Sequence, residues 1–377
     1  MSGTSQQQLP VIAILTIDDS KEQFRGNRDN FADIMKTGKD LGYVVYIVTT
    51  KDLKLKAKRV LGYNYIPESD EWKQELFPLP QVIYNRIPLR EDELQPAVRN
   101  KINEVLLHPH IQMYNPFFFN KRFLFEWLRK SRATRQFMPS TQKLSTPSHL
   151  SKMLNRHSYL FLKPESGKAG MGIMTIKHIP AKTLRYRLKI QDKKGSLSYN
   201  CSTINKLWTR VRKITGANPY IVQQGISLAT FNHRPFDLRL LIQKNSKGRW
   251  DVTGVGARVA GESSITTHVP RGGRIDDPEK LLVSVFGIDQ SKKIIGRVKN
   301  AALIVARQVE RGSGYTHGEM SMDLGVDANG GIWFFEANAK PMKFDEPHIR
   351  KRSLERIFHY SNFLAKPSAK DKEGVIS

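Results

Sequence analysis

The chain has 377 residues, of which 39% are hydrophobic and 9% aromatic, a composition typical of a globular protein with two or three domains. No apolar run approaches the roughly 20 residues that a membrane-spanning helix needs. The single cysteine, Cys201, excludes an internal disulfide framework and a cysteine-based metal cluster. The N-terminal residues show neither a basic segment nor a cleavage site of small residues, so we expect no secretory signal and a cytoplasmic protein.

Lys and Arg total 61 against 35 Asp and Glu, which gives a formal net charge of +26. A basic surface attracts polyanions such as nucleic acid. The basic runs at 51–59, 129–135 and 185–194 lie in different regions, and no zinc-finger or RNP-type motif accompanies them. A solvated basic surface is therefore favoured over specific nucleic-acid binding, which stays open.

The first third of the chain alternates between strand-like and helix-like stretches. Short runs rich in Val, Ile and Tyr predict strands, and apolar residues at helical spacing between the first two predict a helix. Strand–helix–strand order indicates a small α/β domain with a mostly parallel sheet, which closes near residues 108–113. The predicted elements are strands at 11–17, 43–49 and 81–87 and a helix at 27–41.

The pattern changes beyond residue 113. Asn115 and Pro116 open a predicted helix at 115–131, and a strand, a glycine-rich turn and a second strand follow at 159–178. The mixed basic segment at 179–219 carries no assigned element. The other predicted elements are a connector or short strand at 138–144, strands at 220–226, 235–244 and 250–260, a hairpin turn at 245–248, a helix at 292–311 and a hairpin at 321–341.

The glycine-rich turn is a candidate phosphate loop. Gly167, Gly170 and Gly172 would let backbone N–H groups approach a phosphate closely. It is neither a Walker loop nor a dinucleotide fingerprint, because no Lys-Ser/Thr pair ends it and no helix follows. A flexible hairpin without a ligand is the alternative. Lys163 favours the phosphate interpretation, since an ammonium at the end of an apolar strand needs an anion partner.

The C-terminal hairpin carries three polar side chains among large apolar residues. Glu336 and Asn338 lie two residues apart on one strand and share a face, and cross-strand pairing could place the carboxylate of Asp323 near Glu336. Two carboxylates and an amide oxygen suit Mg²⁺, which prefers oxygen ligands and is often shared with substrate phosphates. The alternative is a carboxylate paired with a nearby arginine. The trio therefore predicts a magnesium site.

Two arginines lie on the predicted strands between the glycine loop and this hairpin. Arg239 alternates with two leucines, and Arg258 lies on the next strand. Guanidinium groups there could clamp phosphoryl oxygens. Each alone is typical of a surface or ion-paired arginine. Combined with the magnesium ligands and the glycine loop, they indicate a phosphate site.

Over residues 112–345 the chain resembles the ATP-grasp superfamily of carboxylate–amine ligases. The resemblance rests on the order of NKRFLFEWL, FLKP, SGKAGMG, YIVQQGI, FDLRLLI, GARVA and MDLGVDANGGIWFFEANAKP. The terminal Asp…Glu-x-Asn motif is its most specific part. Within the superfamily, HGEMSMDLGVDANGGIWFFEANAKP is most similar to the YheC/YheD endospore coat-associated proteins of spore-forming bacteria.

The resemblance implies ATP and Mg²⁺ as ligands and a role for each candidate residue. Many relatives carry Glu at the start of the segment that contacts adenine and ribose, where this chain has Gln223 and Gln224. The implied nucleotide-binding residues are Lys121, Lys163, Ser166, Gly167, Gly170, Gly172, Gln223, Gln224 and Ile226. The implied catalytic residues are Arg239 and Arg258, and the implied metal ligands are Asp323, Glu336 and Asn338.

The resemblance also implies an α/β fold with two α+β lobes that clasp ATP, preceded by a small parallel α/β domain. The implied limits are residues 1–112 for the N-terminal domain and 113–222 for the small lobe with its glycine-rich flap. Residues 223–365 would form the large lobe with the magnesium site, and residues 366–377 a flexible tail.

The implied reaction has two steps. A substrate carboxylate attacks the γ-phosphate of ATP to give an acyl phosphate and ADP, and an amine or another nucleophile then displaces phosphate. The substrates are not identified, although the positive charge makes an anionic peptide or polymer one candidate. A non-catalytic spore coat protein that keeps an ATP site and a basic nucleic-acid-binding protein are the alternatives. The roles of Arg86, His268, Arg271, His317 and Glu319 stay open.

Overall fold

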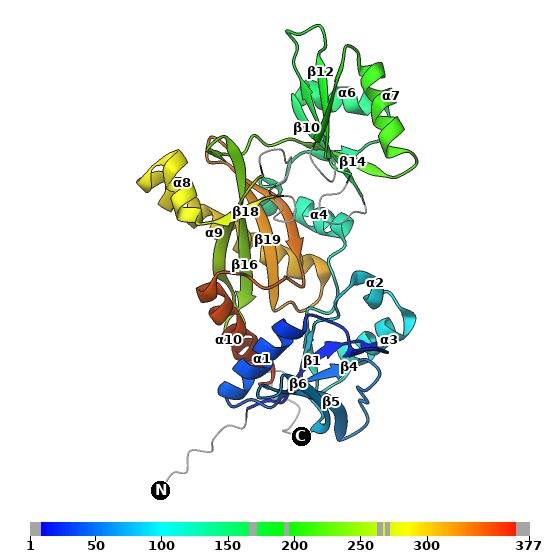
Figure 1. Cartoon of the computed structure of the whole chain (residues 1–377), viewed down its shortest axis with the longest axis vertical. Coiled ribbons are helices and arrows are strands. Elements are labelled where there is room, and N and C mark those ends of the chain that lie inside the picture. Colours follow the sequence, from blue (N-terminus) through cyan, green and yellow to red (C-terminus); the bar gives the residue numbers. More distant parts are fainter. Residues whose placement is uncertain (1–8, 166–171, 192–195, 262–266, 268–271, 367–377) are drawn as a thin grey trace, which may run out of the picture.

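The computed structural model describes residues 9–165, 172–191, 196–261, 267 and 272–366. Three large sheets follow one another along the long axis of the molecule (Figure 1). The first sheet, from the N-terminal residues, and the second lie at opposite ends, and the third lies between them. Among the described residues, no helix is both long enough and apolar enough to cross a membrane.

The first sheet has the strand order β6-β5-β4-β1-β7-β8. β1 (Ile12–Thr16) pairs in parallel with β4 (Val45–Thr49) and with β7 (Val82–Asn85), and β7 pairs in parallel with β8 (Gln112–Tyr114). The three predicted strands and their parallel pairing are therefore confirmed. Residues of β1 alternate between two cores, one under α1 and α10 and one under α3, which explains why the strand is apolar throughout.

An antiparallel hairpin that the sequence analysis misses extends one edge of this sheet. β5 (Arg59–Ile66) pairs with β6 (Glu71–Pro78), and five of the eight residues of β6 are exposed and four are polar, so no apolar run marks the strand. The remaining elements of this region are β2 (Asp18–Asp19), β3 (Gln23–Phe24), α1 (Arg28–Asp40), α2 (Arg90–Glu93) and α3 (Pro96–Leu106).

The second sheet is antiparallel, with the strand order β13-β12-β11-β10-β14-β9. Helices α6 and α7 cover one face, where their apolar side chains join the strands in one core. Among its described residues, the basic segment left unassigned at 179–219 contains two strands and a helix. In the first of these strands, apolar residues that join the core alternate with lysine and arginine on the open face. The bounds are β9 (Thr141–Lys143), α6 (Pro147–Arg156), β10 (Tyr159–Pro164), β11 (Met174–His178), β12 (Tyr186–Gln191), β13 (Ser196–Cys201), α7 (Ile204–Thr215) and β14 (Tyr220–Gln224).

The third sheet has the strand order β18-β17-β16-β19-β20, and β15 also pairs with β16. The predicted hairpin of 235–244 and 250–260 is confirmed, as is the helix at 292–311, which lies within α9. The strands of the third sheet and the helices between them are β15 (Thr230–Phe231), β16 (Arg234–Lys244), β17 (Trp250–Val259), β18 (Arg274–Asp276), α8 (Pro278–Phe286), α9 (Ile288–Ser313), β19 (Glu319–Val326) and β20 (Ile332–Asn338).

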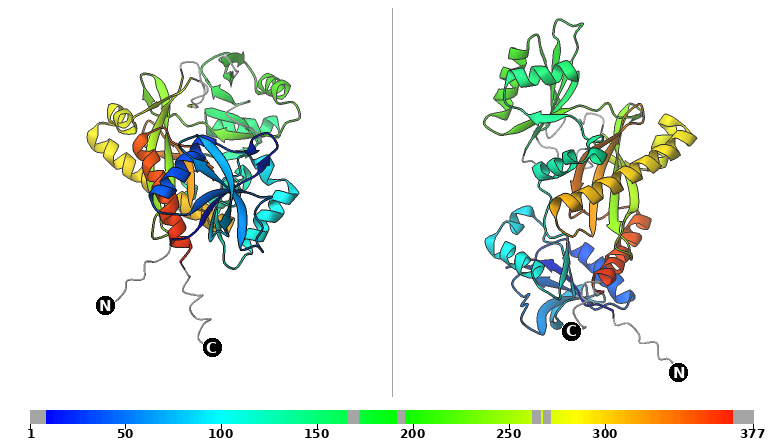
Figure 2. Two further views of the ribbon diagram at one scale, coloured as in Figure 1. Left: turned by 60° about the horizontal axis from the view of Figure 1, so that its bottom comes forward. Right: turned by 180° about the vertical axis from the view of Figure 1, so that it is seen from behind.

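Two helices connect the third sheet to the rest of the chain. α4 (Lys121–Lys130) is followed by α5 (Arg132–Arg135) and packs in one core with α9, so it lies with the third sheet rather than with the second. α10 (Pro347–Leu364) lies beside α1, as Figure 2 shows, and contributes side chains to the core of the first sheet. A Cβ on Gly38 of α1 would lie 2.6 Å from Phe358 of α10, so a glycine is needed for this close approach.

Candidate functional site

The face of the third sheet opposite α9 gathers the predicted metal ligands. In the strand register, Asp323 of β19 lies directly opposite Arg239 of β16 and Glu336 of β20. Asn338 lies opposite Ser321, two residues before Asp323. Directly opposed residues share a face of a sheet. The register therefore brings Arg239 and the predicted trio to one face, and we call this surface the site face.

A β-bulge turns Glu336 toward the site face. Phe334 is fully buried in the core on the α9 side, and strict alternation would send Glu336 to that same side. The register shifts between Asp323 and Leu324, so Phe335 is the extra residue and Glu336 pairs with Asp323. The sequence analysis does not anticipate this bulge, although it places Glu336 and Asn338 on a common face.

Gly325 leaves room for the ring of Phe335. A Cβ at this position would lie 2.5 Å from Phe335 and 2.7 Å from Leu228. We expect Gly325→Ala to lower the free energy of unfolding by about 1–3 kcal/mol, because the ring and the bulge must shift. Urea denaturation measures this, with Gly296→Ala as the control, since a Cβ on Gly296 of α9 meets open space. Equal stability of the two variants would contradict the prediction.

Arg258 bridges two buried aspartates at one end of the site face. Its Nε and Nη2 atoms lie 3.1 and 3.2 Å from the two carboxylate oxygens of Asp237, and Nη2 also lies 2.7 Å from Oδ2 of Asp323. Burial opposes the charge of Arg258, but the two carboxylates outweigh it and raise its pKa. Burial raises the pKa of Asp237, against the attraction of Arg258. The guanidinium of Arg258 is therefore paired with two carboxylates. For Asp323 this agrees with the alternative given above, a carboxylate paired with a nearby arginine.

The other oxygen of Asp323 has no such partner. Its Oδ1 atom is buried and forms no hydrogen bond with any described residue, and the same holds for Oγ of Ser321. A buried carboxylate oxygen without a donor is costly, and a bound cation would offset that cost. Nowhere in the described part of the chain do three His, Cys, Asp or Glu side chains come together as ligands. The oxygen donors available to a cation here are thus Asp323, Glu336 and the amide of Asn338, a set that fits Mg²⁺.

Two lysines approach Glu336 from other elements. Nζ of Lys121, at the start of α4, lies 3.5 Å from Oε1 of Glu336. Lys163, at the end of β10, donates to Oε1 of Gln223 over 2.7 Å. Burial lowers the pKa of Lys163 to about 8, while Glu336 acts in the opposite direction and Lys121 in the same one. These charges therefore belong to one electrostatic cluster.

The predicted nucleotide residues of β14 also make contacts. The amide of Gln223 donates to Oγ1 of Thr141 over 3.0 Å, and Oε1 of Gln224 accepts from the backbone N–H of Ser140 over 3.2 Å. Ile226 is half-buried just beyond the strand. The side chains of Gln223 and Gln224 therefore anchor β14 to the start of β9.

Only part of the glycine loop is described. Gly172 adopts a φ of +72°, and its carbonyl accepts from the hydroxyl of Tyr220 over 3.0 Å. Ser166, Gly167 and Gly170 lie outside the described residues, as do His268, Arg271 and the predicted flexible tail from residue 367 onward.

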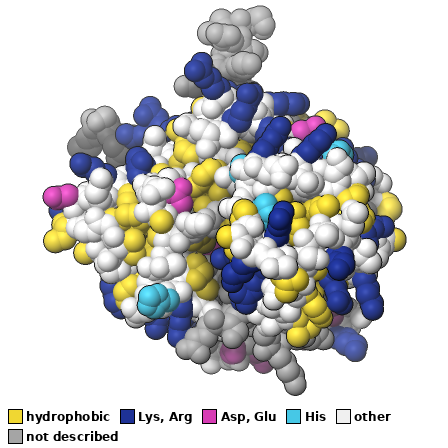
Figure 3. Space-filling view, turned by 90° about the horizontal axis from the view of Figure 1, so that it is seen from above, with side chains coloured by type: hydrophobic (Ala, Val, Ile, Leu, Met, Phe, Trp, Pro, Cys, Tyr) yellow, Lys and Arg dark blue, Asp and Glu magenta, His cyan; other side chains and the backbone are white. Residues whose placement is uncertain are grey.

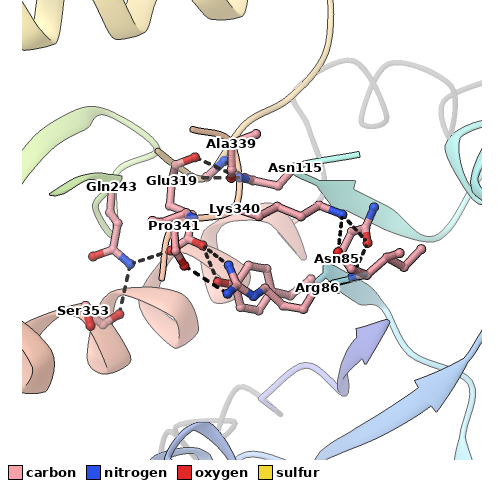
Figure 4. A network of polar contacts seen from close by, with 12 residues as sticks. Asn85, Arg86, Asn115, Gln243, Glu319, Ala339, Lys340, Pro341 and Ser353 are labelled. Atoms are coloured by element: carbon pink, nitrogen blue, oxygen red, sulfur yellow. Dashed lines mark hydrogen bonds and ion pairs between the residues drawn. The ribbon is translucent and has the colours of Figure 1, made fainter. Parts of the chain in front are cut away.

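A buried polar network joins the first sheet to the third (Figure 4). Nη1 of Arg86 lies 3.1 Å from Oε1 of Glu319, which also accepts from the hydroxyl of Tyr84. Nη2 of Arg86 donates to the carbonyl of Pro341 over 3.0 Å. Burial raises the pKa of Glu319, and Arg86 opposes that shift. Arg86 is thus an ion-pair partner that is largely buried between the first and third sheets.

Lys340 extends this network two residues beyond Asn338. Its Nζ atom lies 2.9 Å from Oδ1 of Asn85 and pairs with the carboxylate of Glu93, and both charged side chains are at most 5% exposed. Burial lowers the pKa of Lys340 to about 8 and raises that of Glu93. The only sequence signal for this pair is a lysine at the end of an apolar strand.

Asn115 holds the backbone at the same junction. Its side-chain amide donates to the carbonyls of Glu319 and Ala339, and its oxygen accepts from the N–H of Gly318 over 2.7 Å. The sequence analysis assigns Asn115 to a helix start, whereas α4 begins six residues later. One buried amide therefore fixes the start of β19 and the end of β20, the two strands that carry the predicted metal ligands.

A small cavity, open to solvent, lies beside this network. Leu241, which lies two residues from Arg239 on β16, lines it together with Lys343. Two ion-paired arginines also line it, Arg86 with Glu319 and Arg350 with Asp33. Arg239 itself stacks over Phe344, with its guanidinium carbon 5.2 Å from the ring centroid. The cavity thus continues the site face toward the first sheet.

His317 is packed away from this cavity. Its ring is 2% exposed, with Nε2 2.9 Å from Oγ of Ser313, and burial lowers its pKa to about 3. The imidazole is therefore neutral near pH 7, which favours polar packing over a role as a base.

Residues 110–364 match the family described as YheC/D like ATP-grasp. The chain belongs to this family. The match covers all of the second and third sheets and the helix α10, and it confirms both the ATP-grasp fold and the family that the motifs indicate.

Two curated relatives from Bacillus subtilis (strain 168) match nearly the whole chain. The endospore coat-associated protein YheD is 25% identical, over 97% of this chain and 81% of its own length. The endospore coat-associated protein YheC is 22% identical, over 88% of this chain and 89% of its own length.

Solved structures with the same fold include ligases. The ATP-grasp ligase PsnB, complexed with a variant of its minimal precursor, Mg and ADP, matches with a TM-score of 0.51 at 13% identity and covers 95% of this chain and all of its own. D-alanyl-alanine synthetase A from Vibrio cholerae O1 matches with a TM-score of 0.50 at 13% identity, over 96% of this chain and 100% of its own. At this identity the likeness establishes the fold alone.

Proposed function

We propose that this protein is an ATP- and Mg²⁺-dependent ligase that activates a substrate carboxylate as an acyl phosphate for attack by an amine or another nucleophile. The observation that carries the proposal is the buried, unpartnered Oδ1 of Asp323, which lies on one face with Glu336, Asn338 and Arg239. Membership of the ATP-grasp family and the Mg and ADP in the PsnB complex support it.

Each group on the site face would have a distinct task. Arg258 holds Oδ2 of Asp323 and so orients the free oxygen of that carboxylate toward a cation. Lys121 and Lys163 would hold the phosphates of ATP, and Arg239 would face the transferred phosphoryl group. Mg²⁺ bound by Asp323, Glu336 and Asn338 would neutralise phosphate charge and fix the phosphate geometry.

The bond changes follow from this arrangement. A carboxylate oxygen of the substrate attacks the γ-phosphorus, and the bond to the bridging oxygen breaks as ADP leaves with its electron pair. The nucleophile then attacks the acyl carbon, and phosphate leaves with the oxygen that came from the carboxylate.

An isotope experiment tests the reaction. Substrates whose carboxylates carry ¹⁸O are incubated in a panel with amines, ATP and Mg²⁺, and both ADP and phosphate are analysed. We expect ADP release that depends on the carboxylate, with one ¹⁸O in each phosphate formed. ADP release without transfer of ¹⁸O would indicate a simple ATPase, and absence of Mg·ATP binding would overturn the proposal.

The pKa of Lys163 predicts a pH dependence of nucleotide binding. Because this pKa is about 8, the ammonium loses its charge as the pH rises from 7 to 9.5, and ATP affinity should fall over that range. Lys163→Arg should remove this decline, since a guanidinium stays charged. Calorimetric titrations at several pH values compare the two, and an equally steep decline in both would contradict the role of Lys163.

Linkage gives the same lysine an opposite effect on stability. The unfolded chain holds its proton up to an ordinary pKa of 10.5, above that of the folded state. The contribution of Lys163 to stability therefore rises with pH between about 8 and 10.5. Weaker ATP binding in that range is therefore not explained by a lower contribution of Lys163 to the stability of the fold.

The names of the two curated relatives support a further proposal, that this protein also associates with the endospore coat. Fractionation of spores with an antibody against the chain tests this. A coat-associated protein that binds Mg·ATP but releases no ADP with any carboxylate would be the non-catalytic alternative.

A further inference from the structure

The positive charge of the chain is concentrated in the second sheet and its helices. Residues 141–224 contain sixteen Lys and Arg against two acidic residues, Glu165 and Asp192, a net charge of +14 out of +26. The basic runs lie in different regions of the sequence, yet less than a quarter of the residues carries more than half of the net charge. Figure 3, which views the molecule from this end, shows Lys and Arg side chains scattered over the visible surface, with few Asp and Glu side chains among them.

Besides Lys163, four of these cations lie on the open face of the second sheet, opposite its helices. Lys177 of β11 lies directly across from Arg187 of β12, and Lys189 of β12 lies across from Thr175. Lys143 lies on β9, the strand at one edge of the sheet, opposite Ile221 of β14. None of the four forms an ion pair with a described residue.

This face leads to the proposed phosphate site. Lys163 lies on it, because the ring of Phe161 and the cation of Lys163 are on the same side of β10, 5.5 Å apart. Lys177 lies 5.1 Å from the ring of Tyr159 on that same side. Neighbouring strands are about 4.8 Å apart, so the cations of β12 lie roughly 10 Å from β10. A chain that crosses β12 and β11 would therefore reach the site at Lys163.

The charges of this face are unfavourable without a ligand. Like charges directly opposed on a sheet destabilise it, and Lys177 and Arg187 are such a pair. One Mg·ATP carries only about two negative charges, and it would lie at Lys163, Lys121 and the site face. The cations of β11 and β12 are therefore left for a second, larger anion.

We propose that this face is the docking surface for an acidic polypeptide, whose carboxylates are the substrates of the site at Lys163. The inference rests on the proposed ligase function, because a polymer of carboxylates supplies both the charge that the face attracts and the group that the reaction consumes. Nucleic acid would match the charge, but it offers no carboxylate. The electrostatic contacts would raise the local concentration of substrate beside the γ-phosphate.

The test compares two charge reversals of equal size. Arg187→Glu/Lys189→Glu changes the open face, and Lys292→Glu/Lys293→Glu changes two exposed lysines of α9, on the core side of the third sheet. Binding of a fluorescent poly-glutamate of about 20 residues is followed by anisotropy at several salt concentrations. We expect the first variant to bind about tenfold more weakly, with a smaller salt slope, and the second to stay within about twofold of wild type.

Two further measurements separate docking from folding and from catalysis. Arg187→Glu faces Lys177 with an opposite charge, so its melting temperature should rise slightly while polymer binding falls. Mg·ADP affinity should be unchanged in both charge-reversal variants, because neither the pair on the open face nor the pair on α9 lies in the nucleotide site. Arg187→Gln/Lys189→Gln repeats the experiment without a new negative charge.

Each outcome decides one claim. Equal losses in both charge-reversal variants, or no poly-glutamate binding at low salt, would overturn the docking surface. Tighter binding of single-stranded or duplex DNA than of poly-glutamate, lost in the first variant only, would identify nucleic acid as the partner instead. Poly-glutamate binding without any Mg·ATP binding would retain the surface and refute the ligase function.

Discussion

Asp323→Ala is expected to weaken Mg·ADP binding by at least about 100-fold. Changes of outer-shell partners of a bound metal typically cost 10–100-fold in affinity, and loss of a direct ligand costs at least as much. The free Oδ1 atom of Asp323 is the buried acceptor that a cation would satisfy. Calorimetric titration of ADP at fixed Mg²⁺ concentration measures the loss.

The fold should survive this change. Arg258 still pairs with both oxygens of Asp237 when Asp323 is removed, so the guanidinium does not become an unpaired buried charge. Thermal unfolding and far-UV circular dichroism check this directly. A large loss of nucleotide binding in a folded protein would then report on the site.

Asp237→Asn is the matched control. Asp237 is an aspartate like Asp323, is equally buried and also pairs with Arg258. Both oxygens of Asp237, however, already accept hydrogen bonds from Arg258 and Thr267. We expect this variant to lose stability while Mg·ADP affinity stays within about tenfold of wild type. If Asp323→Ala bound Mg·ADP like wild type, the magnesium site would be refuted.

Much of the third sheet can be predicted from the sequence because its strands are short apolar runs separated by turn residues. The pairing of Asp323 with Glu336 follows from a tight turn between two such runs. The bulge at Phe335 is harder, yet a signal exists: Phe334 and Glu336 have the same parity, and a fully buried ring and a site carboxylate cannot share a face. Local alternation alone does not resolve that conflict, since either residue could be the one displaced.

The contacts between sheets are beyond such patterns. Lys340 and Glu93 are separated by 247 positions, and Arg86 and Glu319 by 233. No periodicity links residues so far apart, and a lysine or glutamate is normally read as exposed. The strand at 186–191 is different, because Tyr186, Leu188 and Ile190 alternate with polar residues, a pattern that does predict a half-buried strand. The limits of the three domains stay a prediction, and the packing of α4 against α9 bears on where the small lobe begins.

Lys340→Met is expected to lower the free energy of unfolding by about 3–5 kcal/mol. Removal of one partner from a buried ion pair leaves the other charge uncompensated, and the side chains of Lys340 and Glu93 are 3% and 5% exposed. Urea denaturation measures the loss. Lys101→Met serves as the control, because its partner Glu104 is 54% exposed and a surface pair contributes at most about 1 kcal/mol.

The pH dependence of this loss identifies its cause. Burial already raises the pKa of Glu93, and without Lys340 the shift increases. A carboxyl whose folded pKa is raised loses stability as the pH rises from its ordinary value of 4.5 through the folded value. Lys340→Met should therefore cost more at pH 8 than at pH 5, and Lys340→Met/Glu93→Gln should recover part of the loss at pH 8. A cost that does not change with pH would indicate lost packing instead of an unpaired charge.

The same variant tests whether the junction positions the site. Lys340 lies two residues after Asn338, and the intervening carbonyl of Ala339 accepts from Asn115. Loss of the ion pair frees the end of β20, so Mg·ADP affinity should fall in Lys340→Met at a temperature where the protein is fully folded. Partial recovery in the double variant would show that the buried pair acts on the magnesium ligands through the strand. Unchanged affinity in the folded single variant would show that the first sheet contributes stability to the site face but no order to its ligands.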